Sequence, residues 1–187
     1  VSTDESDTYM LFDGVGTLDL NNKTIKHTSA RTGKNQVMID VRGKLTVKDG
    51  TITTQHIGDN MAWSKCTEIF YVGFNGTLNL IDATLENLGG SDMAYCVDLV
   101  NASEPDGITV NIENSVLKST YIPFRVFNNG NGINKVTINN STLEGASRAV
   151  WIHIYTVEDN KGVVKDTTLD LDIYDNGNTF IANDPNR

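Results

Sequence analysis

Several features that are common in proteins are scarce in this sequence, and each absence narrows the choice of fold and function. No apolar run approaches the roughly 20 residues that a membrane-spanning helix needs, so membrane insertion is not expected. Basic residues are outnumbered, with 15 Lys and Arg against 24 Asp and Glu and a net charge of −9. Because the chain has no basic stripe to replace the counterions of a phosphate backbone, nucleic acid is not an expected partner.

Proline is also rare, with three residues in a chain of 187. Few prolines, together with many Asn, Asp, Thr and Gly residues, favour strands that are joined by turns with left-handed backbone positions. No stretch keeps the 3.6-residue apolar period of an amphipathic helix, and these polar residues are poor helix formers. The composition therefore points to an all-β protein.

A short pattern is present six times along the chain. It consists of two apolar residues that flank a polar one, then an Asn or Asp two positions later, and an apolar residue three positions after that. The starts of the copies lie 27, 33, 32, 26 and 33 residues apart. Self-similarity at such intervals indicates a solenoid, in which each repeat stacks on the one before. The copies begin at Leu18, Leu45, Leu78, Val110, Val136 and, in a degenerate form, Leu169.

Each part of the pattern has a physical role in such a coil. The alternating apolar residues predict a half-buried strand, and the last apolar residue returns a side chain to the interior. The Asn/Asp position predicts a bend, because these residues tolerate the left-handed region and bind nearby backbone groups. Equal positions of successive coils would stack at roughly the 4.8 Å strand spacing. The predicted bend residues are Asn22, Asp49, Asp82, Asn114 and Asn140.

The pattern resembles the right-handed parallel β-helix of the pectate-lyase-like superfamily, whose members have inward aliphatic stacks and Asn ladders at one bend. The resemblance covers about residues 9–175. We therefore expect an all-β, right-handed parallel β-helix of about six coils, forming a single domain over residues 1–187 with polar ends at 1–8 and 176–187. A sandwich of antiparallel hairpins is the rival fold, but it does not explain the recurring Asn/Asp position. Because the ends of a solenoid must be capped, we expect neighbouring domains of a larger protein.

The two cysteines have two interpretations. Cys66 and Cys96 lie close to one coil apart and could bridge adjacent coils. Aligning Ile69 with Val97 leaves them two residues out of register, a separation of roughly 7–8 Å that strains a disulfide. Two buried free thiols are therefore favoured.

A second strand in each coil carries the candidate functional residues. If Val97 and Leu99 and their counterparts point inward, their neighbours form an outward face on which an Asp98, Arg125 and His153 column lies beside aromatic rings. Aromatic faces stack on sugar rings, and Arg and carboxylate groups bind hydroxyls or uronic acid carboxylates. The polysaccharide-active members of the resembled superfamily bind substrate on the outer face of stacked strands. The alternative is a surface ion pair with rings that lie beneath a loop or another domain. The candidate ligand-binding residues are Phe70, Asp98, Arg125, Phe127, Trp151, His153 and Tyr155.

Catalysis has weaker support in the sequence. Glycoside hydrolysis generally requires two carboxylates, and only Asp98 clearly lies on this face. If the protein were an enzyme, Asp98, Arg125 and His153 would form its centre. Lyases of this fold commonly bind calcium, and Asp13 and Asp40 occupy matching positions one coil apart, but two aspartates are too few for a calcium site. We therefore expect no metal and no cofactor, and calcium is a candidate cofactor only in the lyase alternative.

The sequence leads to one preferred function and two alternatives. The preferred one is a non-catalytic, adhesin-like module, secreted or at the surface of a bacterial cell, with a polysaccharide or glycan as its candidate partner. The first alternative is a polysaccharide lyase or glycoside hydrolase that acts on an acidic polysaccharide. The second is a structural spacer, whose stacked coils only hold other domains apart.

Overall fold

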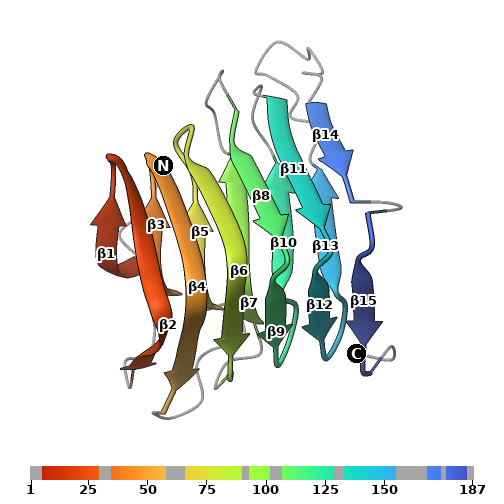
Figure 1. Ribbon diagram of the computed structural model, residues 1–187. Helices are drawn as coiled ribbons and strands as arrows, with labels where there is room; N and C mark the ends of the chain where they lie inside the picture. Colours follow the sequence, from red (N-terminus) through yellow and green to blue (C-terminus); the bar gives the residue numbers. More distant parts are fainter. Residues whose placement is uncertain are drawn as a thin grey trace, which may run out of the picture.

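The computed structural model describes residues 6–29, 35–57, 66–89, 93–101, 107–128, 133–154, 168–173 and 176–184. Every regular element within these ranges is a β-strand, and the strands build a parallel β-solenoid (Figure 1). This confirms the all-β parallel solenoid predicted from the repeat. No helix that could span a membrane occurs in the described ranges.

One wall of the solenoid is a six-stranded sheet in which neighbouring strands come from successive coils. Each pair is parallel, and in Figure 1 these strands run opposite to those of the other wall. One or two strands of the chain lie between each pair of neighbours in this parallel order, so the chain must wind round once from each strand to the next. Its strands in spatial order are β1 (Ser6–Phe12), β3 (Asn35–Val41), β5 (Cys66–Val72), β7 (Met93–Asn101), β10 (Phe124–Asn128) and β13 (Val150–Ile154).

The other wall is a nine-stranded sheet that is folded along the Asn/Asp bend. In the first coils a single long strand runs through the bend, whereas later coils divide there into two strands. The long strands are β2 (Val15–Ser29), β4 (Lys44–His56) and β6 (Thr77–Asn87). The shorter ones are β8 (Thr109–Glu113), β9 (Val116–Ser119), β11 (Ile133–Asn139), β12 (Thr142–Gly145), β14 (Thr168–Asp172) and β15 (Thr179–Ala182).

The bend adopts the backbone conformation that its residues predict. All five expected positions have positive φ angles, between 47° and 58°. Serine side chains of the following coil bind the backbone here, since Ser115 Oγ accepts from Ala83 N at 3.1 Å and Ser141 Oγ accepts from Ser115 N at 3.0 Å. The corner is therefore held by a side-chain ladder along the solenoid axis as well as by its left-handed residues.

The interior consists of apolar columns, because parallel pairing in constant register stacks equal positions of the repeat. Leu45, Leu78, Val110 and Val136 form one such column, and all are at most 3% exposed. Apolar columns become exposed at both ends of the stack. Met10, in register with Ile39, is 52% exposed, and Phe180, in register with Leu143, is 41% exposed. The predicted inward stacks are thus confirmed, and only their middle members are fully buried.

Both cysteines are buried free thiols, as the sequence analysis favoured. Cys66 is in register with Met93 and packs with Tyr95 and Ile122, whereas Cys96 belongs to the main apolar core. The two sulfur atoms therefore lie in separate packing clusters.

Candidate functional site

The outward face of the six-stranded sheet brings together the residues that the sequence singled out on three strands. In β7, β10 and β13, Asp98, Arg125 and Trp151 are in register. Phe127 and His153 form the neighbouring register position on β10 and β13. His153 therefore lies beside Phe127, and Trp151 takes the place in the Asp98–Arg125 column that was expected for His153.

Arg125 and Asp98 form a buried bidentate ion pair. Arg125 Nε donates to Asp98 Oδ1 at 2.7 Å, and Nη2 donates to the second carboxylate oxygen. The side chains are 13% and 0% exposed, so this is no exposed surface pair. Burial by itself lowers the pKa of Arg125, but the charge and hydrogen bonds of Asp98 outweigh it and raise that pKa. The guanidinium is thus a permanent charge held in one orientation.

Aromatic rings surround the same guanidinium. Its Cζ atom lies 4.3 Å from the ring centroid of Tyr95, 5.5 Å from that of Phe127 and 6.0 Å from that of Trp151. A cation over an aromatic face within about 6 Å is attracted by the ring quadrupole, most strongly when it is desolvated. Arg125 therefore positions these rings in addition to pairing with Asp98.

Three partly exposed rings of β10 and β13 form a surface that we call the aromatic strip: Phe127, Trp151 and His153. The Trp151 and His153 rings are stacked, with centroids 5.7 Å apart and an interplanar angle of 22°. Phe127 meets His153 edge-on at 5.5 Å and 77°. Trp151 also packs against the buried cluster of Cys66, Tyr95 and Ile122, which fixes the ring. The strip is an apolar, electron-rich surface of the kind that stacks on a sugar ring.

A second carboxyl group, Glu68 on β5, lies next to Asp98. Glu68 is 3% exposed and accepts a hydrogen bond from Cys66 Sγ at 2.6 Å. Burial, then the neighbouring negative charge of Asp98, raises the pKa of Glu68 well above its usual range. No described residue donates a hydrogen bond to Glu68 Oε2. Burial and the neighbouring carboxylate therefore favour the protonated form of Glu68.

Sequence reasoning missed Glu68 and placed Phe70 on the outward face, which is wrong. Ile69 and Phe70 both belong to the core with 0% exposure, and the strand pairing skips Ile69. A bend at this point turns two successive side chains inward and shifts the alternation, so that Glu68 faces outward instead. The sequence feature that indicates this shift is a pair of successive apolar residues in three strands, at Met38–Ile39, Ile69–Phe70 and Cys96–Val97. Tyr155, the remaining predicted member, lies outside the described residues.

The expected pairing of Asp13 with Asp40 does not occur. Asp40 is in register with Leu11 and is bound by Arg42, whose Nη2 lies 2.8 Å from Asp40 Oδ2. Within the described ranges no group of three His, Cys, Asp or Glu side chains is arranged to hold a metal ion.

The chemistry open to this face follows from the burial of its charged groups. Asp98 and Glu68 are 0% and 3% exposed, so a polymer on the surface does not touch either carboxyl. The rings of the aromatic strip are half-buried and therefore remain partly accessible. Comparisons with known protein families, with curated proteins and with solved structures gave no match.

Proposed function

We propose that this protein is a non-catalytic, adhesin-like module that binds carbohydrate through the aromatic strip. In this proposal it is secreted or displayed on a bacterial surface, within a solenoid of the pectate-lyase-like type. The supporting observation is the Trp151 indole, which is stacked on His153 and held beside the fixed Arg125 guanidinium on the outer face of the sheet. A rigid, half-exposed ring binds a sugar with little loss of conformational entropy.

The buried carboxyl groups favour binding over catalysis. A glycosidase places two carboxyl groups on either side of the scissile bond. Here Asp98 is occupied by Arg125, and Glu68 is in contact with Cys66 below the surface. A lyase or hydrolase acting on an acidic polysaccharide is therefore the less supported alternative.

Binding on a glycan array and by affinity electrophoresis tests the proposal. Trp151→Ala should weaken binding about tenfold or more, which corresponds to about 1.4 kcal/mol. Trp151→Phe, which keeps an aromatic face, should retain most of the affinity, and circular dichroism should show that both variants are folded. His153→Ala supplies a second variant that leaves the contacts of Trp151 with the buried cluster in place.

Two results would contradict the proposal. The first is a wild-type protein that binds no glycan, or one whose binding is unchanged in Trp151→Ala and His153→Ala. The second is the release of unsaturated or reducing ends from polygalacturonate or alginate incubated with the protein, with or without calcium. That second result would favour the enzyme.

A further inference from the structure

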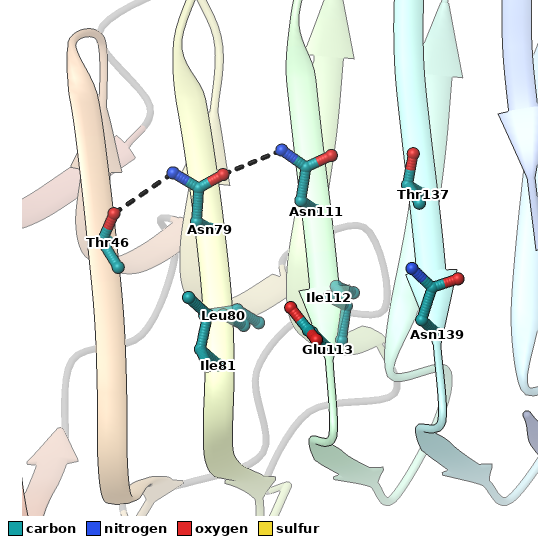
Figure 2. A pocket seen from close by; sticks show the side chains of 9 residues that line it. All are labelled: Thr46, Asn79, Leu80, Ile81, Asn111, Ile112, Glu113, Thr137 and Asn139. Atoms are coloured by element: carbon teal, nitrogen blue, oxygen red, sulfur yellow. Dashed lines mark hydrogen bonds between the residues drawn. The ribbon is translucent and has the colours of Figure 1, made fainter.

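A second surface, on the opposite wall of the solenoid, has the features of a ligand site. A groove of about 350 Å³ crosses the outer face of β4, β6, β8 and β11 (Figure 2). This volume lies at the lower end of the roughly 300–1,000 Å³ typical of small-molecule sites. The groove belongs to the folded sheet and contains none of the residues of the aromatic strip.

Side chains of four neighbouring strands form a row along this groove. Thr46 is in register with Asn79, Asn79 with Asn111, and Asn111 with Thr137. Because the strands are parallel, these side chains repeat at roughly the 4.8 Å strand spacing along the solenoid axis. A linear polymer that lies across the strands would meet an equivalent group at every step.

Hydrogen bonds hold the amides of this row in one orientation. Asn111 Nδ2 donates to Asn79 Oδ1 at 2.8 Å, and Asn79 Nδ2 donates to Thr46 Oγ1 at 3.2 Å (Figure 2). Each amide nitrogen carries two N–H groups and each amide oxygen has two lone pairs, so every Asn keeps donor and acceptor capacity for a ligand. The row is thus fixed before a ligand binds, which lowers the entropy loss on binding.

A second row adds both an apolar contact and a carboxylate. Ile81 is in register with Glu113, and Glu113 with Asn139, one pleat further along the same strands. Ile81 is half-buried in the groove and offers its side chain to the C–H face of a ring, while Glu113 is exposed and accepts hydrogen bonds. Of the described residues that line the groove, none is basic. A uronic acid or phosphate group would therefore meet an uncompensated carboxylate.

We propose that this groove binds a neutral, hydroxyl-rich polysaccharide that runs along the solenoid axis. Sugar hydroxyls both donate and accept, which matches the free capacity of Asn79, Asn111, Thr137 and Asn139. This site adds a second surface for the ligand class of the proposed function, but it involves different residues and is tested separately.

The test is an NMR titration that follows the side-chain amide signals of Asn79 and Asn111. The probes are cellohexaose, xylohexaose and mannohexaose, with trigalacturonate as an anionic counterpart. We expect at least one neutral hexaose to shift both signals and trigalacturonate to shift neither. Asn111→Ala should weaken the binding of that hexaose about tenfold or more, since it removes a ligand contact and frees the Asn79 amide. Thr142→Ala, on β12 beyond the bend, is the matched control and should leave binding unchanged.

Each failure has its own reading. If none of the three hexaoses shifts the two signals, if trigalacturonate alone does, or if Asn111→Ala binds as tightly as the wild type, the inference is wrong. Binding that Trp151→Ala abolishes, with unshifted Asn79 and Asn111 signals, would overturn the groove and leave the aromatic strip. Shifts of both Asn signals that persist in Trp151→Ala would support the groove even if the aromatic strip binds no glycan.

Discussion

Replacing Glu68 by Gln should change how the stability of the protein depends on pH. The folded protein raises the pKa of Glu68 through burial and the neighbouring Asp98 charge, so folding favours the protonated form. The stability that comes from this protonated carboxyl is fully present below the pKa of Glu in the unfolded chain, about 4.3. As the pH rises from there towards the pKa in the folded state, the free energy of unfolding should fall by about 1.4 kcal/mol per pH unit from this group.

Gln is the appropriate substitution because it resembles protonated Glu and does not titrate. Its amide oxygen accepts the Cys66 thiol, and its NH₂ group supplies a donor next to Asp98. Urea unfolding at half-unit steps between pH 4.5 and pH 7 gives the free energy of unfolding of both proteins. The difference between Glu68→Gln and the wild type should grow steadily in favour of Gln as the pH rises.

Glu144→Gln is the control of opposite sign. Hydrogen bonds from Asn183 and Lys118 lower the pKa of Glu144, so its contribution to stability is lost as the pH falls, and Gln should not gain on the wild type at higher pH. Parallel curves for Glu68→Gln and the wild type would refute the raised pKa of Glu68 in the folded protein. A Gln variant that loses stability relative to the wild type as the pH rises would show that folding lowers the pKa of Glu68.

Three further predictions concern the ion pair, the bend and the core. Arg125→Met should destabilise the protein by about 3–5 kcal/mol in urea unfolding, because it leaves the buried Asp98 charge unpaired. Adding Asp98→Asn should recover part of this loss. An effect of Arg125→Met below about 1 kcal/mol would mean that the ion pair is hydrated. Asn114 has a φ of 49°, so Asn114→Ala should lower the free energy of unfolding by about 1–2 kcal/mol and Asn114→Gly by less, as measured by thermal unfolding. Equal effects of Ala and Gly would contradict a left-handed backbone at this position. Leu80 is fully buried, so Leu80→Ala should lower the free energy of unfolding by about 2–5 kcal/mol. Phe180 lies at the end of a column and is 41% exposed, so Phe180→Ala should have a smaller effect. The reverse order would mean that the ends of the stack are covered.

The solenoid was predictable because its sequence signals are local and repeated. The alternation around Leu45 and Leu78 specifies which side of a strand is apolar, and the Asn or Asp at the bend specifies where the chain turns. Because this local pattern is present six times, few other folds can satisfy the alternation and the bend in every copy. The free thiols were predicted from an alignment of Ile69 with Val97. The structure pairs Phe70 with Val97 instead, and the two cysteines are out of register and free all the same.

The candidate site was predictable only in part. Simple alternation along β7, β10 and β13 predicted that Asp98, Arg125 and Trp151 face outward. It did not set the register, in which Trp151 rather than His153 is level with Arg125. Alternation fails where two successive side chains turn inward, so that Phe70 was misplaced and Glu68 was overlooked. Because a one-residue shift moves a side chain to the opposite face, a single bend was enough to change the composition of the site.

The sequence by itself determined the coil: apolar alternation, the Asn and Asp bends and the spacing of the repeat are properties of the chain within each turn. Only the tertiary structure decided which side chains form ion pairs, which pKa values are shifted and which side chains lie on one surface. The repeated pattern contains neither Glu68 nor Arg125, and each of these residues interacts with Asp98 on a coil some 30 positions away. Their pKa values and exposure depend on what surrounds them after folding, and no local pattern carries that information.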